Sequence, residues 1–283
     1  MNNKTKAIIY MLGSSFFFAL MAALVKLSGD LPTVQKIFCR NLVSCFVAGG
    51  IAIHHKKKLF GKRENQKYLL LRSLLGTIGM ICYFYSIDHM LLSDSAMLNK
   101  INPFFVSILA CLFLKEKFSK IQIPALIVAF IGALFIIKPQ FNLEMLPSIV
   151  AVVGAMFAAG AYTMVRFLGD KEEFYTIVFY FSFFSTAVTF PLTIMSYTPM
   201  STTQILLLIG IGIVASAAQF TMTIAYRFAP AGEISILNYT NVLFAGILGF
   251  ILWRNIPDFM SVIGYCLIIG VAFIIYKYNK VKG

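Results

Sequence analysis

The sequence predicts an all-α integral membrane protein of ten transmembrane helices, arranged as two five-helix repeats in opposite orientations. Three observations support this fold class: ten long apolar runs, basic residues concentrated in alternate loops, and an internal repeat at about half the chain length. Of the 283 residues, 59% are hydrophobic and only 12% are charged. A soluble domain of this length would carry about twice that charge, which disfavours a soluble fold.

Ten apolar runs have the length that a helix needs to cross the hydrocarbon layer, roughly 17–25 residues. The expected spans are residues 7–28, 34–53, 68–88, 93–114, 121–137, 146–165, 175–196, 204–226, 232–252 and 258–278. The first run continues from Ala7 to Val25, longer than the apolar region of a typical signal peptide. We therefore expect it to be the first helix.

The basic residues set the expected orientation. With ten spans, 17 of the 24 basic residues fall on one side, including six between the second and third spans: Lys56, Lys57, Lys58, Lys62, Arg63 and Lys67. Basic loops stay in the cytoplasm, so we expect both termini there, in a bacterial inner membrane. The formal net charge of +13 is then explained by cytoplasmic loops that determine the orientation and face anionic lipid. No nucleic-acid partner is expected.

The residues that usually carry catalysis or bind metals form no recognisable pattern. The five cysteines and three histidines show no metal-ligand spacing. No nucleophile, zinc-protease or phosphate-loop motif occurs. We therefore expect no enzyme, metal or cofactor, and an intramembrane enzyme is the less favoured alternative.

The chain repeats itself after about 140 residues. Residues 98–105 (LNKINPFF) match 237–244 (LNYTNVLF), and residues 131–137 (IGALFII) match 269–275 (IGVAFII). This divides the chain into 1–140 and 141–283, each with five spans. Because five is an odd number, the second half crosses the membrane in the opposite orientation to the first. Such repeats are typical of secondary transporters, in which two halves rock about a small-molecule site near the midplane.

The repeated segments hold the candidate substrate-binding residues. Asn99 and Asn102 share one helix face, and Asn238 and Asn241 repeat that face in the second half. Amides within a membrane either line a cavity or join helices, and both interpretations stay open. Pro103 permits a kink and frees a backbone carbonyl. The expected substrate-binding set is Asn99, Lys100, Asn102, Asn238, Tyr239, Asn241, Arg40, Tyr83 and Gln219.

Fixed charge within the spans is net positive. Lys100 and Arg40 are expected inside the membrane, where a cation costs at least ~2.5–3.5 kcal/mol, whereas no carboxylate is expected at mid-depth. This pattern favours a substrate with a negative group. Arg72, near the inner end of its span, is expected to extend to the inner surface.

Four charges are candidates for gating. The repeat relates Asp94 to Glu233 and, with a one-residue slip, Lys26 to Arg166. We expect Lys26 with Asp94 at the outer mouth and Arg166 with Glu233 at the inner mouth, each pair closing its mouth in alternation. The alternative is that all four charges anchor helix ends among lipid headgroups.

The chain resembles the EamA-type carriers of the drug/metabolite transporter superfamily over nearly its whole length. The similarity rests on Pro32, Arg40, Tyr85, Ala96, Pro103, Glu116 and Gly132. The second half departs from the pattern, because Val242 stands for the proline and Asn255 for the acid. The resemblance implies ten helices around a central cavity and the transport of metabolites such as amino acids. Residues 72–76 (RSLLG) with Gly79, Met80 and Tyr83 resemble the branch that contains S-adenosylmethionine carriers.

The leading prediction is a secondary transporter for a small polar metabolite that is amino-acid-like, zwitterionic or S-adenosylmethionine-like. The alternative is an exporter of hydrophobic drugs, which the 28 phenylalanines and 13 methionines allow. The first span lacks the glutamate of the related small multidrug exporters, which disfavours export of quaternary cations. A coupling ion or counter-substrate, and a monomer or homodimer, are left open.

Overall fold

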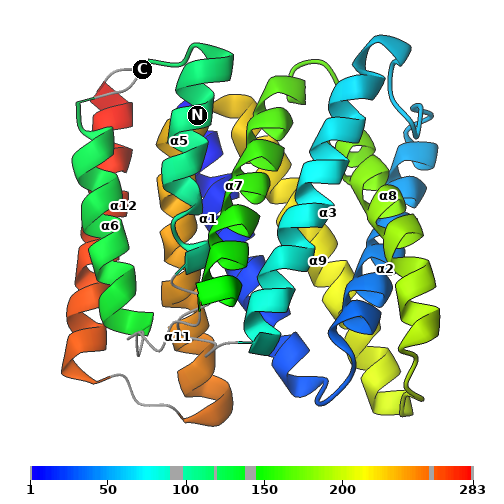
Figure 1. Cartoon of the computed structure of the whole chain (residues 1–283). Helices are drawn as coiled ribbons and strands as arrows, with labels where there is room; N and C mark the ends of the chain where they lie inside the picture. The colour runs from blue at the N-terminus through cyan, green and yellow to red at the C-terminus, as the bar shows by residue number, and fades with distance from the viewer. Residues whose placement is uncertain (1, 90–97, 118–119, 138–144, 255–257, 282–283) are drawn as a thin grey trace.

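The computed structural model describes residues 2–89, 98–117, 120–137, 145–254 and 258–281, and within these ranges it contains helices and no strand. Figure 1 shows the helices standing side by side as one bundle. The long helices are α1 (Asn3–Leu27), α2 (Thr33–His54), α3 (Gln66–His89), α7 (Met145–Leu168), α8 (Phe174–Met195), α9 (Thr202–Phe228) and α12 (Phe259–Val281). The shorter elements are η1 (Arg63–Asn65), α5 (Asn102–Leu114), α6 (Gln122–Ile137), α10 (Ala231–Ile234), η2 (Ser235–Tyr239) and α11 (Thr240–Trp253).

The all-α membrane class is confirmed. Within the described residues, seven helical stretches are long and apolar enough to cross a membrane, and one of them, Ala231–Leu252, combines α10, η2 and α11. Three further apolar helical segments are shorter: Asn102–Leu114, Gln122–Ile136 and Phe259–Ile275. The count of ten crossings therefore stays a prediction.

Two expected spans are not continuous helices. In the span 93–114, Leu98 and Asn99 are helical, Lys100 and Ile101 form a turn, and α5 begins afresh at Asn102. Pro103 lies in the first turn of α5, where its missing N–H leaves no helical bond unmade. A helix start thus replaces the expected kink. In the span 232–252, the 3₁₀ segment η2 separates α10 from α11.

The main helix contacts join the first half of the chain to the second. Helix α1 packs on α9 and α11, α3 and α5 pack on α7, α2 packs on α8, and α6 packs on α12. The halves consequently form one integrated bundle (Figure 1).

Glycines allow two of these contacts to be close. A Cβ atom added to Gly79 of α3 would lie 2.8 Å from the backbone nitrogen of Ala158 in α7, and one on Gly154 would lie 2.7 Å from Cβ of Cys82. Between α6 and α12, a Cβ on Gly264 would lie 2.5 Å from the carbonyl oxygen of Gly132. Small residues at such contacts are what membrane helices use to pack backbone against backbone.

One end of the bundle collects the basic loops. The start of α1, the end of α12 and the α2–α3 and α7–α8 connections lie at the same end (Figure 1), which we call the basic end. Here Glu172 is nearly buried and accepts hydrogen bonds from the backbone nitrogen of Lys62 at 2.8 Å and from Nδ2 of Asn65 at 2.7 Å. The carboxylate thereby ties the two connections together.

Candidate substrate site and gate

The two interrupted helices meet inside the bundle, at a contact that we call the junction. The hydroxyl of Tyr239 donates to the carbonyl oxygen of Lys100 at 2.7 Å, and Nζ of Lys100 donates to Oδ1 of Asn241 at 3.1 Å. Nδ2 of Asn241 donates in turn to the carbonyl oxygen of Ser15 in α1 at 3.0 Å. Lys100 of the first half is therefore hydrogen-bonded to both Tyr239 and Asn241 of the second half, and all three belong to the expected substrate residues.

The repeated asparagines do not form one hydrogen-bonded set. Asn102 is 6% exposed, and its Nδ2 donates to the carbonyl oxygen of Ala155 in α7 at 2.9 Å. This bond joins α5 to α7, as packing amides do. Asn99 and Asn238 are half-buried at the two breaks, beside the junction residues in sequence.

Arg72 does not extend to the inner surface, and that expectation is wrong. Its side chain is 1% exposed, its Nη2 donates to Oε1 of Gln219 at 3.1 Å, and its guanidinium lies 3.8 Å from the centre of the Phe181 ring. Helix α3 packs against both α7 and α8, and Arg72 lies on the side of α3 that faces α8 and α9. Hydropathy places a residue along a span but does not say which side of the helix faces lipid.

Arg40 is the second buried guanidinium, at 7% exposure. Its Nη1 donates to Oδ1 of Asn41 at 3.0 Å and lies 3.4 Å from the sulfur of Met80, and its Nε lies 3.3 Å from the sulfur of Met21. Thioether sulfurs are weak acceptors. Asn41 is itself held by α8, because its Nδ2 donates to Oγ of Ser185 at 3.0 Å.

Arg40, Arg72, Gln219 and the phenol of Tyr162 make up what we call the arginine layer. Arg40, Arg72 and Gln219 are buried, and Tyr162 is half-buried. Tyr162 also stacks on Tyr226, with ring centres 5.9 Å apart. Among the described residues, no carboxylate forms an ion pair with either buried guanidinium. Of the remaining candidates, Tyr83 is a half-buried residue of α3.

An ion-pair cluster lies at the basic end. Nε of Arg166, in the last turn of α7, lies 3.1 Å from Oε1 of Glu116 in the α5–α6 connection. Nη1 of Arg166 donates to the carbonyl oxygens of Tyr226 at 3.0 Å and Arg227 at 2.9 Å. Oε2 of Glu116 accepts from the backbone nitrogen of Gly232 in α10 at 3.4 Å. One arginine and one glutamate thus connect α7, α9 and α10.

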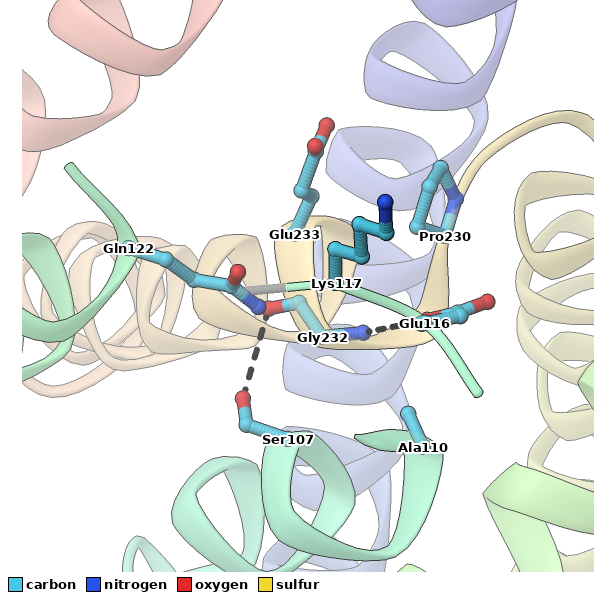
Figure 2. A pocket seen from close by; sticks show the side chains of 8 residues that line it. All are labelled: Ser107, Ala110, Glu116, Lys117, Gln122, Pro230, Gly232 and Glu233. Atoms are coloured by element: carbon cyan, nitrogen blue, oxygen red, sulfur yellow. Dashed lines mark hydrogen bonds between the residues drawn. The ribbon is translucent and has the colours of Figure 1, made fainter. Parts of the chain in front are cut away.

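Figure 2 shows the surroundings of Glu116, a pocket with about 190 Å³ of empty space that includes open solvent. The hydroxyl of Ser107 donates to the carbonyl oxygen of Gly232 at 3.4 Å, so α10 is held by α5 as well as by Glu116. The pocket is lined by Ser107, Ala110, Glu116, Lys117, Gln122, Pro230, Gly232 and Glu233.

The expected pair of Arg166 with Glu233 is not the ion pair that this structure shows. Arg166 pairs with Glu116, whereas Glu233 lies 3.8 Å from Nζ of Lys4 at the start of α1. The expectation aligned residues across the repeat, and Glu116 has no acidic counterpart there, since Asn255 stands for it. Lys26 lies in the last turn of α1 at the opposite end, and its expected partner Asp94 lies outside the described residues.

Three contributors to these sites are not among the site residues expected from the sequence. Arg72 is expected at the surface, Glu116 enters only through the family resemblance, and Asn41 is not among the expected residues. A signal existed for Asn41, because an amide directly after Arg40 in an apolar span is costly unless both groups face the protein interior.

A bundle of apolar helices, interrupted at matching places and carrying buried cations between its ends, defines a membrane transporter. The chain belongs to the EamA-like transporter family, whose model matches it twice, over residues 5–138 and 145–277. The family predicted from the sequence is confirmed.

Two curated relatives and one solved structure show how far the similarity extends. The chain is 31% identical over 273 residues to the pseudopaline exporter CntI of Pseudomonas aeruginosa, covering 94% of each protein. It is 24% identical over 281 residues to human solute carrier family 35 member G1, covering 93% of this chain and 76% of that protein. A crystal structure matches with a TM-score of 0.83 over 95% of each chain at 13% identity, which shows a shared fold.

Proposed function

We propose that this chain is a secondary transporter that moves a small polar metabolite with an acidic group across the plasma membrane by alternating access. The metabolite is amino-acid-like, zwitterionic or S-adenosylmethionine-like. The observation that carries the proposal is the arginine layer, in which two buried guanidinium groups have no carboxylate partner among the described residues. A buried charge without a counter-charge is costly, so an acidic group of the substrate supplies what the protein lacks.

The helix contacts support two inverted five-helix halves. If α1, α2, α3, α5 and α6 correspond to α7, α8, α9, α11 and α12, exchanging the halves converts the α1–α9 contact into α7–α3 and the α1–α11 contact into α7–α5. The contacts α2–α8 and α6–α12 convert into themselves. All six contacts occur, and the family model also matches the chain twice. This is the pattern that a pseudo-two-fold axis in the membrane plane produces.

The orientation follows from charge. The basic end carries the exposed lysines of the α2–α3 connection, and such loops stay in the cytoplasm. Both termini are then cytoplasmic, and Arg166 with Glu116 closes the cytoplasmic mouth. Lys26 with Asp94 is the proposed counterpart at the outer mouth. The name of the Pseudomonas relative, an exporter, favours export as the direction.

The alternative function is export of hydrophobic drugs. The apolar groups around the arginines favour it. The sulfurs of Met21 and Met80 and the ring of Phe181 contact the guanidinium groups and would suit an apolar solute. Such a site would not need two buried cations.

A thermal-shift screen of the purified protein separates the two functions. The panel contains amino acids, nucleosides, S-adenosylmethionine and the hydrophobic cation tetraphenylphosphonium. A ligand at 100 times its Kd stabilises the folded state by about 2.7 kcal/mol, so a bound compound raises the apparent Tm by several degrees. We expect compounds with a carboxylate to do so. A shift produced by tetraphenylphosphonium alone would favour the drug exporter instead.

A further inference from the structure

Arg72 has unused hydrogen-bonding capacity in the protein interior. A guanidinium carries five N–H donors, and within the described part of the chain this one makes a single hydrogen bond, from Nη2 to Gln219. Its Nε and Nη1 are buried and have no hydrogen-bond partner among the residues that the structure describes. The face of the group stacks on Phe181, which offsets only part of the cost of burying the charge. At least two N–H groups of Arg72 are therefore available to an oxyanion.

The hydrogen-bond donors of the Arg40 guanidinium have only weak or uncharged acceptors. Its partners are the sulfurs of Met21 and Met80 and the amide of its neighbour Asn41, none of which carries a charge. A carboxylate that approached Arg40 would replace two weak sulfur contacts with charge-assisted hydrogen bonds, which are roughly twice as strong as neutral ones.

The two guanidinium groups have separate surroundings. Arg72, on α3, contacts residues of α8 and α9, whereas Arg40, on α2, contacts residues of α1, α2 and α3. Both nevertheless carry their positive charge in the protein interior, at 7% exposure for Arg40 and 1% for Arg72. One carboxylate that satisfied either arginine would leave the other without a counter-charge.

Building on the proposed function, we propose that Arg40 and Arg72 bind two different acidic groups of one substrate, so that the transported class is small metabolites with two or more carboxylates. Arginine suits this task because its planar fork matches a carboxylate with two parallel hydrogen bonds, which lysine does not provide. A substrate with two carboxylates supplies each arginine with a counter-charge as it binds. Neither guanidinium is then left without a counter-charge while the transporter changes conformation.

The test compares pairs of ligands that have nearly the same size and differ by one negative charge. The Tm of the purified full-length protein is measured with L-glutamate against L-glutamine and with L-aspartate against L-asparagine. We expect the diacid of each pair to bind about ten-fold more tightly than its amide, because each lost charged hydrogen bond has at least this effect. The difference should disappear in Arg72→Gln and in Arg40→Gln. The matched control is Arg63→Gln, an exposed arginine of the α2–α3 connection, which should keep the difference.

A second variant addresses folding. Arg72→Lys keeps the charge and loses the fork, so it should fold like the parent protein, as judged by its Tm without ligand, and bind glutamate about ten-fold more weakly. Unchanged glutamate affinity in Arg72→Lys would overturn the two-point assignment.

The outcomes separate the inference from the proposed function. Equal shifts from glutamine and glutamate in the parent protein would overturn the dicarboxylate class and leave a carrier for monoacids standing. The absence of any shift from these four amino acids would also overturn the dicarboxylate class. The absence of a shift from every polar compound in the broader screen would overturn both.

Discussion

Lys100→Met should reduce transport of a carboxylate-bearing substrate about ten-fold or more while leaving transport of a neutral analogue nearly unchanged. Methionine preserves much of the length of the side chain and removes its charge. Lys100 lies at the break before α5, where its Nζ reaches Asn241 of the other half. A hydrogen bond to a charged group contributes about 1.5–3 kcal/mol, which corresponds to a ten-fold change or more in flux. Uptake or efflux in reconstituted vesicles provides the measurement.

Two asparagine variants serve as controls for Lys100. Asn241→Ala removes the partner of Lys100 at the junction and should lower transport with nearly normal protein abundance. Asn102→Ala instead removes the bond to Ala155 that joins α5 to α7, and should lower the amount of folded protein. Equal loss of acidic and neutral substrates in Lys100→Met would exclude Lys100 as a counter-charge.

Glu116→Gln should open the basic end and slow turnover. The variant removes the charge that pairs with Arg166 at 3.1 Å and weakens the acceptor for Gly232 of α10. Both side chains of the pair are mostly shielded, at 23% and 16% exposure, so solvent screens this pair less than a surface pair. A cysteine introduced at Asn238 should react several-fold faster with a cytoplasmic thiol reagent, because the equilibrium shifts toward the inward-open state.

The matched control for the gate is Glu233→Gln. Glu233 pairs with Lys4 at 3.8 Å, a longer contact than that of Glu116 with Arg166. The side chains of this pair are about as shielded, at 26% and 18% exposure, but this longer contact joins α10 only to α1 and not to α7 and α9, so labelling at Asn238 should change less than in Glu116→Gln. If Glu116→Gln leaves labelling from both sides unchanged, the cluster anchors helix ends and the gate lies elsewhere.

The all-α membrane class, the family and the contact between the two interrupted helices could be predicted from the sequence, because these depend on local signals. Hydropathy runs mark the helices, and a repeated LN-x-x-N pattern marks the places where both interrupted helices meet. The role of a side chain could not be predicted from the sequence where it depends on which helix packs beside that side chain. Because Arg72 lies near one end of its span, its side chain is expected to reach the membrane surface. In the structure it instead contacts Phe181 of α8 and Gln219 of α9.

The gate shows the same limit in another form. Arg166 and Glu116 are 50 residues apart and meet because α5 packs on α7. Alignment of the two halves relates positions that are equivalent by symmetry, whereas an ion pair needs positions that touch. Equivalence in the repeat indicates Glu233 as the partner of Arg166, but the contact in the structure is with Glu116.

The most direct measurement of the central claim is solute release from vesicles that contain only this protein. Liposomes with the reconstituted chain are loaded with a bacterial metabolite extract, washed, and analysed by mass spectrometry for compounds that leave faster than from protein-free liposomes. We predict that these compounds are small and polar and carry at least one acidic group, and that Arg72→Gln retains them inside. Selective release of apolar or purely cationic compounds, or equal release by Arg72→Gln, would contradict it.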